Sequence, residues 1–228
     1  MATVRIDWPR AHRIIATRHP PIDLFERATP DPAVWEALIA LEELTNPRVR
    51  DAAGAIALVP PEDRIAGPGA SWVMAAFTHL NPKGSRVSDG SYGVYYAADR
   101  LETAVAETAH HFEAFARDSA DPPRTEAMRV LVGTIGADFV DVAAEPDCAA
   151  LLAPDSYVGS RAWGAGQRAA GADGVAFPSV RDPAGACIGA FRPRVVGPPS
   201  AARVVHTRWY GARVDRWYDP AADAWVPR

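Results

Sequence analysis

The sequence predicts a mixed α+β fold, and three observations lead to that class. Strand-like segments outnumber long helical ones and gather late in the chain, over residues 130–135, 139–142, 174–180 and 186–191. One strongly amphipathic helix is expected before them, over residues 101–115. Because helices and strands do not alternate regularly, an α+β arrangement is favoured over repeated βαβ units.

Size and composition fit a water-soluble globular protein. The chain has 228 residues, enough for one large domain or one domain with a smaller appendage. Its hydrophobic content of 48% and charged content of 23% are ordinary for such a domain. A net charge of -4 argues against direct nucleic-acid binding. The N-terminus has no apolar leader and no run of about 18 apolar residues occurs, so we expect no membrane segment and a cytoplasmic protein.

The N-terminal part is expected to form an extension, residues 1–65, ahead of the main domain, residues 66–228. Residues 1–30 are basic and proline-containing, as in an extended arm that packs on another part of the chain. Asp31 then suits the cap of a helix that has Pro32 in its first turn. This helix is expected to pack on the core through residues at helical spacing, namely Trp35, Leu38, Ile39 and Leu44.

The stretch from His79 to His111 combines a Gly/Ser-rich turn, a strand and a helix. Alternation of aromatic and small residues predicts the strand over 92–97. Asp99 is expected to cap the helix, whose apolar stripe places Glu107 at its edge, roughly 120° from the centre. A carboxylate at such an edge is neither in the core nor fully in solvent, as expected for one that lines a cleft.

Several common functional sites are disfavoured by the sequence. Gly164 to Gly171 reads GAGQRAAG and matches the dinucleotide fingerprint formally, but no strand-like segment precedes it. The ExxH pair of Glu107 and His110 lacks the second ExxH that a di-iron centre requires. The chain has two cysteines, too few for a typical zinc site, and no GxSxG elbow. We therefore expect neither a metal centre nor a serine hydrolase.

Arg86, Tyr96 and Glu107 together suggest a ligand site. Taken one by one, they read as an exposed loop arginine, a packed tyrosine and a solvated helix glutamate. Taken together, they supply a bidentate anion binder, an aromatic platform and a carboxylate at short spacing. That combination suits a ligand that carries both phosphate and ribose.

The same pattern resembles the RES domain family, the toxin half of Xre–RES toxin–antitoxin pairs. Tyr96 lies ten positions after Arg86, Glu107 lies eleven positions after Tyr96, and Phe177-Pro178-Ser179 matches a later Pro-Ser on a strand. The resemblance covers roughly residues 70–195. The turn reads GSRVS where the family typically has Gly-Gly-Arg-Trp. For the additional upstream arginine of many members, the nearest candidate here is His79.

This resemblance implies an ADP-ribosyltransferase-like core of small mixed and antiparallel sheets with flanking helices, and an enzyme that consumes NAD+. Glu107 would bind a ribose hydroxyl and stabilise the oxocarbenium-like transition state. Arg86 would hold the pyrophosphate, and Tyr96 would stack on nicotinamide. Ser179 would orient Glu107 or the ribose, and His79 would contact the adenosine side.

The acceptor of ADP-ribose is left open by the sequence. A host protein side chain would make the enzyme a mono-ADP-ribosyltransferase, whereas water or phosphate would make it an NAD+ glycohydrolase or phosphorylase. A non-catalytic binding module is a further alternative, disfavoured because Arg86, Tyr96, Glu107 and Ser179 are all present. The resemblance also implies a helix-turn-helix, Xre-like antitoxin as partner. Surface for a protein acceptor is offered by the N-terminal extension and by the aromatic tail, Trp209, Tyr210, Trp217, Tyr218 and Trp225. Core packing and an antitoxin interface are the alternative interpretations of the same aromatic residues.

Overall fold

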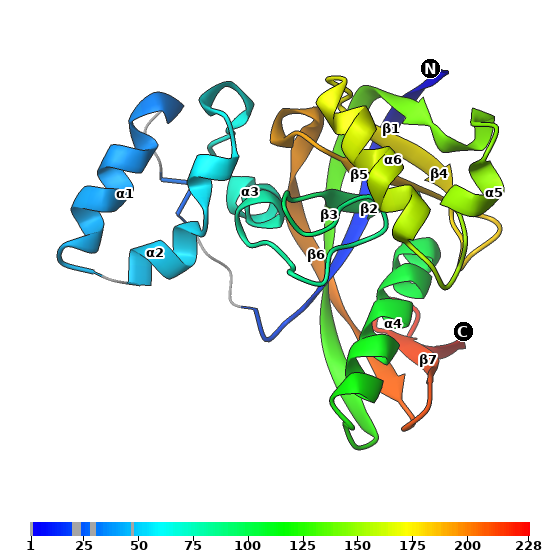
Figure 1. The fold of residues 1–228 in the computed structure, drawn as a ribbon. Coiled ribbons are helices and arrows are strands. Elements are labelled where there is room, and N and C mark those ends of the chain that lie inside the picture. Colours follow the sequence, from blue (N-terminus) through cyan, green and yellow to red (C-terminus); the bar gives the residue numbers. More distant parts are fainter. Residues whose placement is uncertain (1, 20–23, 28–30, 47) are drawn as a thin grey trace.

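One mixed sheet with helices on its two faces forms the body of the protein (Figure 1). The structure, a computed structural model, describes residues 2–19, 24–27, 31–46 and 48–228. The strands are β1 (Thr3–Ala16), β2 (Tyr95–Ala98), β3 (Arg124–Asp141), β4 (Gly174–Pro178), β5 (Ala186–Ala190), β6 (Val196–Trp209), β7 (Val214–Asp219) and β8 (Ala224–Pro227). The α-helices are α1 (Trp35–Glu43), α2 (Arg48–Ala53), α3 (Ala70–Thr78), α4 (Leu101–Asp118), α5 (Cys148–Leu151) and α6 (Val158–Ala169). Short 3-10 turns are η1 (Pro32–Val34), η2 (Ile56–Leu58), η3 (Pro61–Asp63), η4 (Val142–Ala144) and η5 (Pro193–Val195).

The α+β class is confirmed, and the sheet is continuous. Its eight strands run in the order β1-β2-β5-β4-β3-β6-β7-β8, with a further pairing between β1 and β3. Within the described part of the chain, β3 and β4 pair in parallel and the other pairings are antiparallel. The β1–β3 pairing joins the two ends of a five-strand segment, so β1, β2, β5, β4 and β3 form a ring of pairings.

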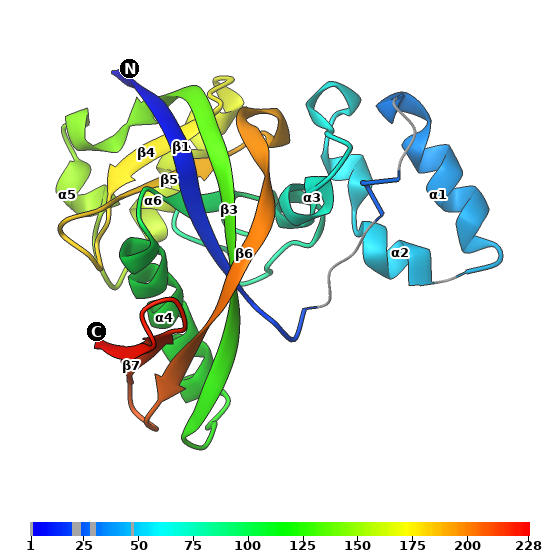
Figure 2. The ribbon, with the colours of Figure 1, turned by 180° about the vertical axis from the view of Figure 1, so that it is seen from behind.

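The first strand is part of this central sheet. β1 pairs with β3 from Thr3 opposite Val140 to Ala16 opposite Met128. Figure 2 shows β1, β3 and β6 as three long neighbouring ribbons, with α1 and α2 set to one side of them. Residues 1–30 were expected to be extended, and within them Thr3–Ala16 form a strand of the central sheet. A domain boundary at residue 65 stays a prediction, but the strand before it belongs to the sheet.

Two hydrophobic clusters fill the two faces of the sheet. One lies under α4 and includes Val105, Phe112 and Trp209. The other lies under α3 and includes Met74, Phe77 and the α1 residue Trp35. The expected cap is found at η1, which leads into α1, because the carboxylate of Asp31 accepts the N–H of Ala33 at 3.0 Å. The expected packing of this helix is corrected in part: Trp35 is buried, but Leu38 and Leu44 are exposed.

The structure corrects several boundaries. The two strands expected around Gly136 are one long strand, β3. The strand expected from Tyr92 begins at Tyr95. Asp99 does not cap α4, because Arg100 occupies the N-cap position and the Asp99 carboxylate instead accepts the N–H of Ala186 at 3.0 Å. That bond ties β5 to the start of α4.

Later elements follow the sequence closely. The strands β4 and β5 form the expected hairpin, and β6 and β7 form another that turns at Gly211, where φ is +91°. The GAGQRAAG segment lies largely within α6, which ends before Gly171 at φ +88°. Across the described ranges, no helix combines the length and apolarity needed to cross a membrane.

Candidate functional site

A cavity of about 250 Å³, here called the cleft, contains the three residues that the sequence singled out. Arg86 comes from the loop between α3 and β2, Tyr96 from β2, and Glu107 from the second turn of α4. Consecutive elements thus bring a guanidinium, a phenol ring and a carboxylate to one opening. Their expected juxtaposition is confirmed by the geometry of the cavity, whereas their roles remain predictions.

Arg86 is buried, with 6% of its surface exposed, and it faces the cleft. Its Nη1 donates to the carbonyl oxygens of Leu151 and Ala153, both at 3.2 Å. Its guanidinium also lies 4.7 Å from the ring centre of Tyr157. Nη2 is buried and has no hydrogen-bond partner among the described residues. A buried guanidinium nitrogen without a hydrogen-bond acceptor indicates that an acceptor, such as a ligand oxygen, binds there.

The loop that carries Arg86 is held from two sides. The hydroxyl of Tyr96 accepts the N–H of Val87 at 3.2 Å and lies 2.8 Å from Ser85 Oγ. The hydroxyl of Tyr92 donates to the carbonyl oxygen of Val87. Gly84 turns the chain into this loop at φ +71°, where a Cβ would lie 2.5 Å from the Ser88 carbonyl oxygen. The position of Arg86 is therefore fixed by its neighbours before any ligand arrives.

Tyr96 offers its ring rather than an ionised oxygen. Burial raises the pKa of Tyr96 to about 12, so the phenol stays protonated at neutral pH. Because its hydroxyl is already bonded to the Arg86 loop, the ring is the part left for contact with a ligand. Arg13 Nη1 donates to the Tyr96 carbonyl oxygen at 3.0 Å, which ties β1 to this residue.

Glu107 is half-buried and held by one oxygen. Ser179 Oγ donates to Glu107 Oε1 at 2.6 Å. No described residue makes a hydrogen bond to Glu107 Oε2. Ser179 does not line the cavity itself, so its expected role in orienting Glu107 fits the geometry better than direct contact with a ribose.

The loop after β4 is fastened to α4 at two further points. Asp182 accepts the hydroxyl of Thr103 at 2.6 Å and lies 3.2 Å from Arg100 Nη2. The second point is Arg181 Nη2, which lies 2.9 Å from His110 Nε2. Because arginine only donates, His110 accepts this bond through a neutral ring nitrogen. Burial, with the nearby Arg181 charge as the next cause, lowers the pKa of His110 to about 4.

Sequence reasoning missed three residues that line the cleft, namely His12, Arg13 and His111. Arg13 and Tyr96 are 83 positions apart in the chain, so no local spacing connects them. Only the pairing of β1 within the sheet brings His12 opposite Ala98 and into the cavity wall. For His111 a signal existed, because it follows Glu107 by four positions and therefore shares its helix face.

His79, the residue assigned to the adenosine side, does not line the cleft. It is the C-cap of α3, and it is exposed. Its ring nitrogens lie 2.8 Å from the Asp51 carbonyl oxygen and 3.0 Å from Thr78 Oγ1. The helix α3 ends on the side of α2, so His79 lies outside the cleft, and its role toward adenosine stays a prediction without support from the geometry. The upstream cation that the cleft does contain is Arg13.

The aromatic tail divides between core and surface. Trp209 and Trp217 are buried, with 1% and 4% of their surface exposed. Tyr210 and Trp225 are exposed, at 68% and 43%. Tyr218 is half-buried, with its ring centre 5.6 Å from that of Trp225, so the surface part of the tail consists of Tyr210, Trp225 and part of Tyr218. Among the described residues, no group of three or more His, Cys, Asp or Glu side chains is placed to hold a metal ion.

Comparison with known proteins gives three findings. The family model described as the RES domain matches residues 61–211 of this chain. A protein of Sinorhizobium fredii, uncharacterized protein y4oC, is 30% identical over 209 residues, which are 91% of this chain and 86% of that protein. A chain in the crystal structure of the M. tuberculosis MbcT–MbcA toxin–antitoxin complex aligns with a TM-score of 0.46 and 12% identity, over 92% of this chain and 88% of that one.

Proposed function

Because the chain belongs to the RES domain family, we propose that it is the toxin of a toxin–antitoxin pair and that it cleaves NAD+ between nicotinamide and ribose. The ADP-ribose released in this step is then transferred to a protein side chain. Release to water or phosphate is the alternative that the same first step allows. The cleft, with Arg86, Tyr96 and Glu107 on its wall, is the proposed site.

The buried guanidinium of Arg86 is the observation that carries the proposal. It forms no ion pair with a described carboxylate, and its Nη2 lacks an acceptor. A pyrophosphate oxygen would supply both the missing charge and the missing hydrogen bond. Arg13 also lines the cleft, but its guanidinium lies 4.6 Å from the Tyr95 ring centre and Nη1 donates to the Tyr96 carbonyl oxygen, so Arg86 is the cation proposed to hold the anion.

Glu107 and Tyr96 then account for the bond that breaks. Stacking on the Tyr96 ring would hold the nicotinamide, and Glu107 Oε2 would accept a hydrogen bond from a ribose hydroxyl. As the C1′–N bond breaks, its electron pair leaves with the nicotinamide nitrogen and positive charge develops on the ribose. The fixed carboxylate stabilises that charge, an interaction that is stronger in the transition state than in bound NAD+.

NAD+ turnover by the purified protein tests the cleavage step. We expect the wild-type chain to release nicotinamide and Glu107→Gln to lower kcat by about 100-fold or more, because the amide keeps the shape but not the charge. Circular dichroism of the variant should match that of the wild type. Release of nicotinamide by Glu107→Gln at the wild-type rate would contradict the proposed role of this carboxylate.

The acceptor is tested separately, with labelled NAD+ and a bacterial lysate. Label on a discrete protein band supports transfer to a protein, whereas free ADP-ribose or its phosphate with no labelled band supports degradation. The growth effect requires a third measurement. Expression of the chain alone should arrest growth and lower cellular NAD+, and co-expression of a helix-turn-helix antitoxin encoded beside it should relieve both effects.

A further inference from the structure

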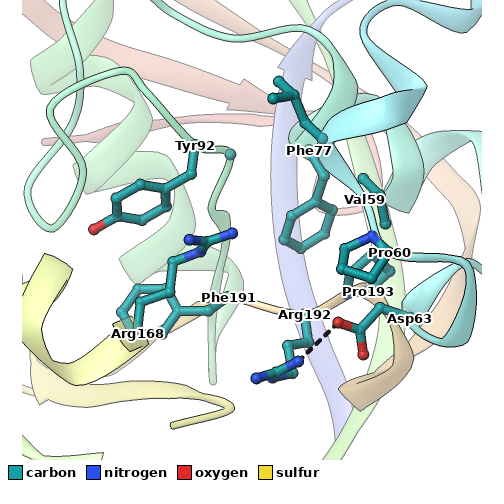
Figure 3. A pocket seen from close by; sticks show the side chains of 11 residues that line it. Val59, Pro60, Asp63, Phe77, Tyr92, Arg168, Phe191, Arg192 and Pro193 are labelled. Atoms are coloured by element: carbon teal, nitrogen blue, oxygen red, sulfur yellow. Dashed lines mark hydrogen bonds and ion pairs between the residues drawn. The ribbon is translucent and has the colours of Figure 1, made fainter. Parts of the chain in front are cut away.

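A second cavity of about 180 Å³, here called the side pocket, lies on the other side of the Arg86 loop from the cleft. It is enclosed by the η2–η3 segment, α3, α6 and the start of η5, and it shares no lining residue with the cleft. Figure 3 shows Tyr92 and Arg168 on one side of it and Phe77, Val59 and Pro60 on the other. Pockets for drug-sized ligands measure about 300–1,000 Å³, so this one suits a single ring or a smaller molecule.

The walls of the side pocket favour an apolar, planar occupant. Phe77 and Phe191 are buried side chains whose rings contribute to the lining. The rings of Tyr92 and Phe191 meet edge to face, with centres 6.0 Å apart. The hydroxyl of Tyr92 is engaged by the Val87 carbonyl oxygen, so an occupant meets the Tyr92 ring and not its polar end. Aromatic walls of this kind bind a ring by burial of apolar surface.

The charges around the side pocket leave one cation without a counterion. Asp63 is buried and is neutralised by Arg192 at 2.9 Å and by Arg194 at 3.2 Å. Asp173 lies 3.0 Å from Arg194 and 3.5 Å from Arg192. The guanidinium of Arg168 lies 4.7 Å from the Tyr92 ring centre and forms neither an ion pair nor a hydrogen bond with any described residue. Of the arginines around the side pocket, Arg168 is therefore the one that forms no ion pair with a described carboxylate.

We propose that the side pocket binds a small monocyclic carboxylate. Its ring would lie against Phe77 and Phe191, and its carboxylate would accept the N–H groups of Arg168. A guanidinium that lies over an aromatic ring and has no other partner keeps its N–H groups free, and a carboxylate can accept two of them in parallel hydrogen bonds. An inorganic anion would satisfy Arg168 but leave the aromatic walls bare, so a ring that bears a carboxylate fits both features. This site does not depend on the proposed NAD+ chemistry.

Titration of the full chain with benzoate tests the site, with benzamide as the neutral probe of the same shape. We expect benzoate to bind more tightly than benzamide by about tenfold, because hydrogen bonds to charged groups contribute about 1.5 kcal/mol or more. Arg168→Gln should remove that difference and leave benzamide binding unchanged. Arg168 is exposed on α6, so its replacement should not affect folding.

Two control variants make the test specific. Arg213→Gln removes an exposed arginine that lines neither cavity, and it should leave benzoate affinity unchanged. Arg86→Gln alters the cleft and should also leave the benzoate affinity of the side pocket unchanged. Equal affinity for benzoate and benzamide would overturn the proposal, as would benzoate binding that responds to Arg86→Gln and not to Arg168→Gln. The proposal would also be overturned if no benzoate binding were detected at about 10 mM benzoate, because a dissociation constant on that order is the weakest expected for so small a ligand.

Discussion

The hydroxyl of Ser179 donates a hydrogen bond of 2.6 Å to Oε1 of Glu107 across 72 positions of sequence. The direction of this bond follows from its other partners. Ser179 Oγ accepts the backbone N–H groups of Arg181 at 3.1 Å and Asp182 at 3.0 Å. Its own hydrogen is therefore left for the carboxylate. The loop after β4 thus fixes one oxygen of Glu107, a residue that lines the cleft, and leaves the other oxygen without a hydrogen bond to a described residue.

Ser179→Ala should lower kcat for NAD+ cleavage by about tenfold and change KM little, because one hydrogen bond of about 1–1.5 kcal/mol no longer orients Glu107 in the transition state. Steady-state kinetics of nicotinamide release measure both constants. Ser156→Ala, at an exposed serine, is the matched control. A normal kcat in Ser179→Ala would show that the bond has no catalytic role.

Arg86→Lys should weaken NAD+ binding by at least about tenfold even though the positive charge is kept. The guanidinium of Arg86 can donate to the Leu151 and Ala153 carbonyl oxygens through one nitrogen and to a phosphate through another. Lysine has a single ammonium group and cannot reach all three acceptors in this planar geometry. Calorimetric titration with NAD+, carried out with Glu107→Gln as background to prevent turnover, gives the affinity. If Arg86→Lys binds NAD+ as tightly as that background, the pyrophosphate role is wrong.

Arg13 and His79 form a matched pair that tests which of the two residues takes the place of the upstream arginine. Arg13→Gln should weaken NAD+ binding by about tenfold, because Arg13 lines the cleft and its Nη1 holds the carbonyl oxygen of Tyr96 in the cavity wall. His79→Gln should leave NAD+ affinity unchanged, because His79 bonds the Asp51 carbonyl oxygen outside the cavity. The reverse result, with loss in His79→Gln alone, would restore the assignment made from sequence.

His110 should make folding stability fall in mild acid. Burial, and then the Arg181 charge, lowers its pKa from 6.5 to about 4, so the unfolded chain binds a proton at a higher pH than the folded chain does. The free energy of unfolding should therefore decrease as pH falls from about 6.5 toward about 4, by an amount on the order of 1 kcal/mol after solvent screening. Urea unfolding at pH 7 and near pH 4.5 measures this change.

His110→Gln should lose less stability than the wild type over the same pH range. Glutamine keeps an oxygen that can accept the Arg181 N–H, but it does not titrate. His19→Gln, at an exposed histidine outside this cluster, should behave like the wild type. Equal losses in the wild type and His110→Gln would exclude His110 as the source.

The sequence predicted elements best where one local rule decided them. Asp31 caps the N-terminal helix segment, Gly171 follows the end of α6, and Gly211 turns the last long hairpin. Each is set by capping or by the φ that glycine tolerates. The errors lay where distant partners compete. Asp99 failed as a cap because the N–H of Ala186, on a strand 87 positions away, takes its carboxylate.

The site shows the same division. The spacing of Arg86, Tyr96 and Glu107 is encoded by one turn, one strand and one helix in succession, so the sequence by itself determined that these three side chains meet. Arg13 and Ser179 join them only because β1 and β4 belong to the same sheet as β2. Their place, and the position of His79 outside the cleft, were decided by tertiary structure, because strand pairing between distant segments leaves no periodic signal in either segment alone.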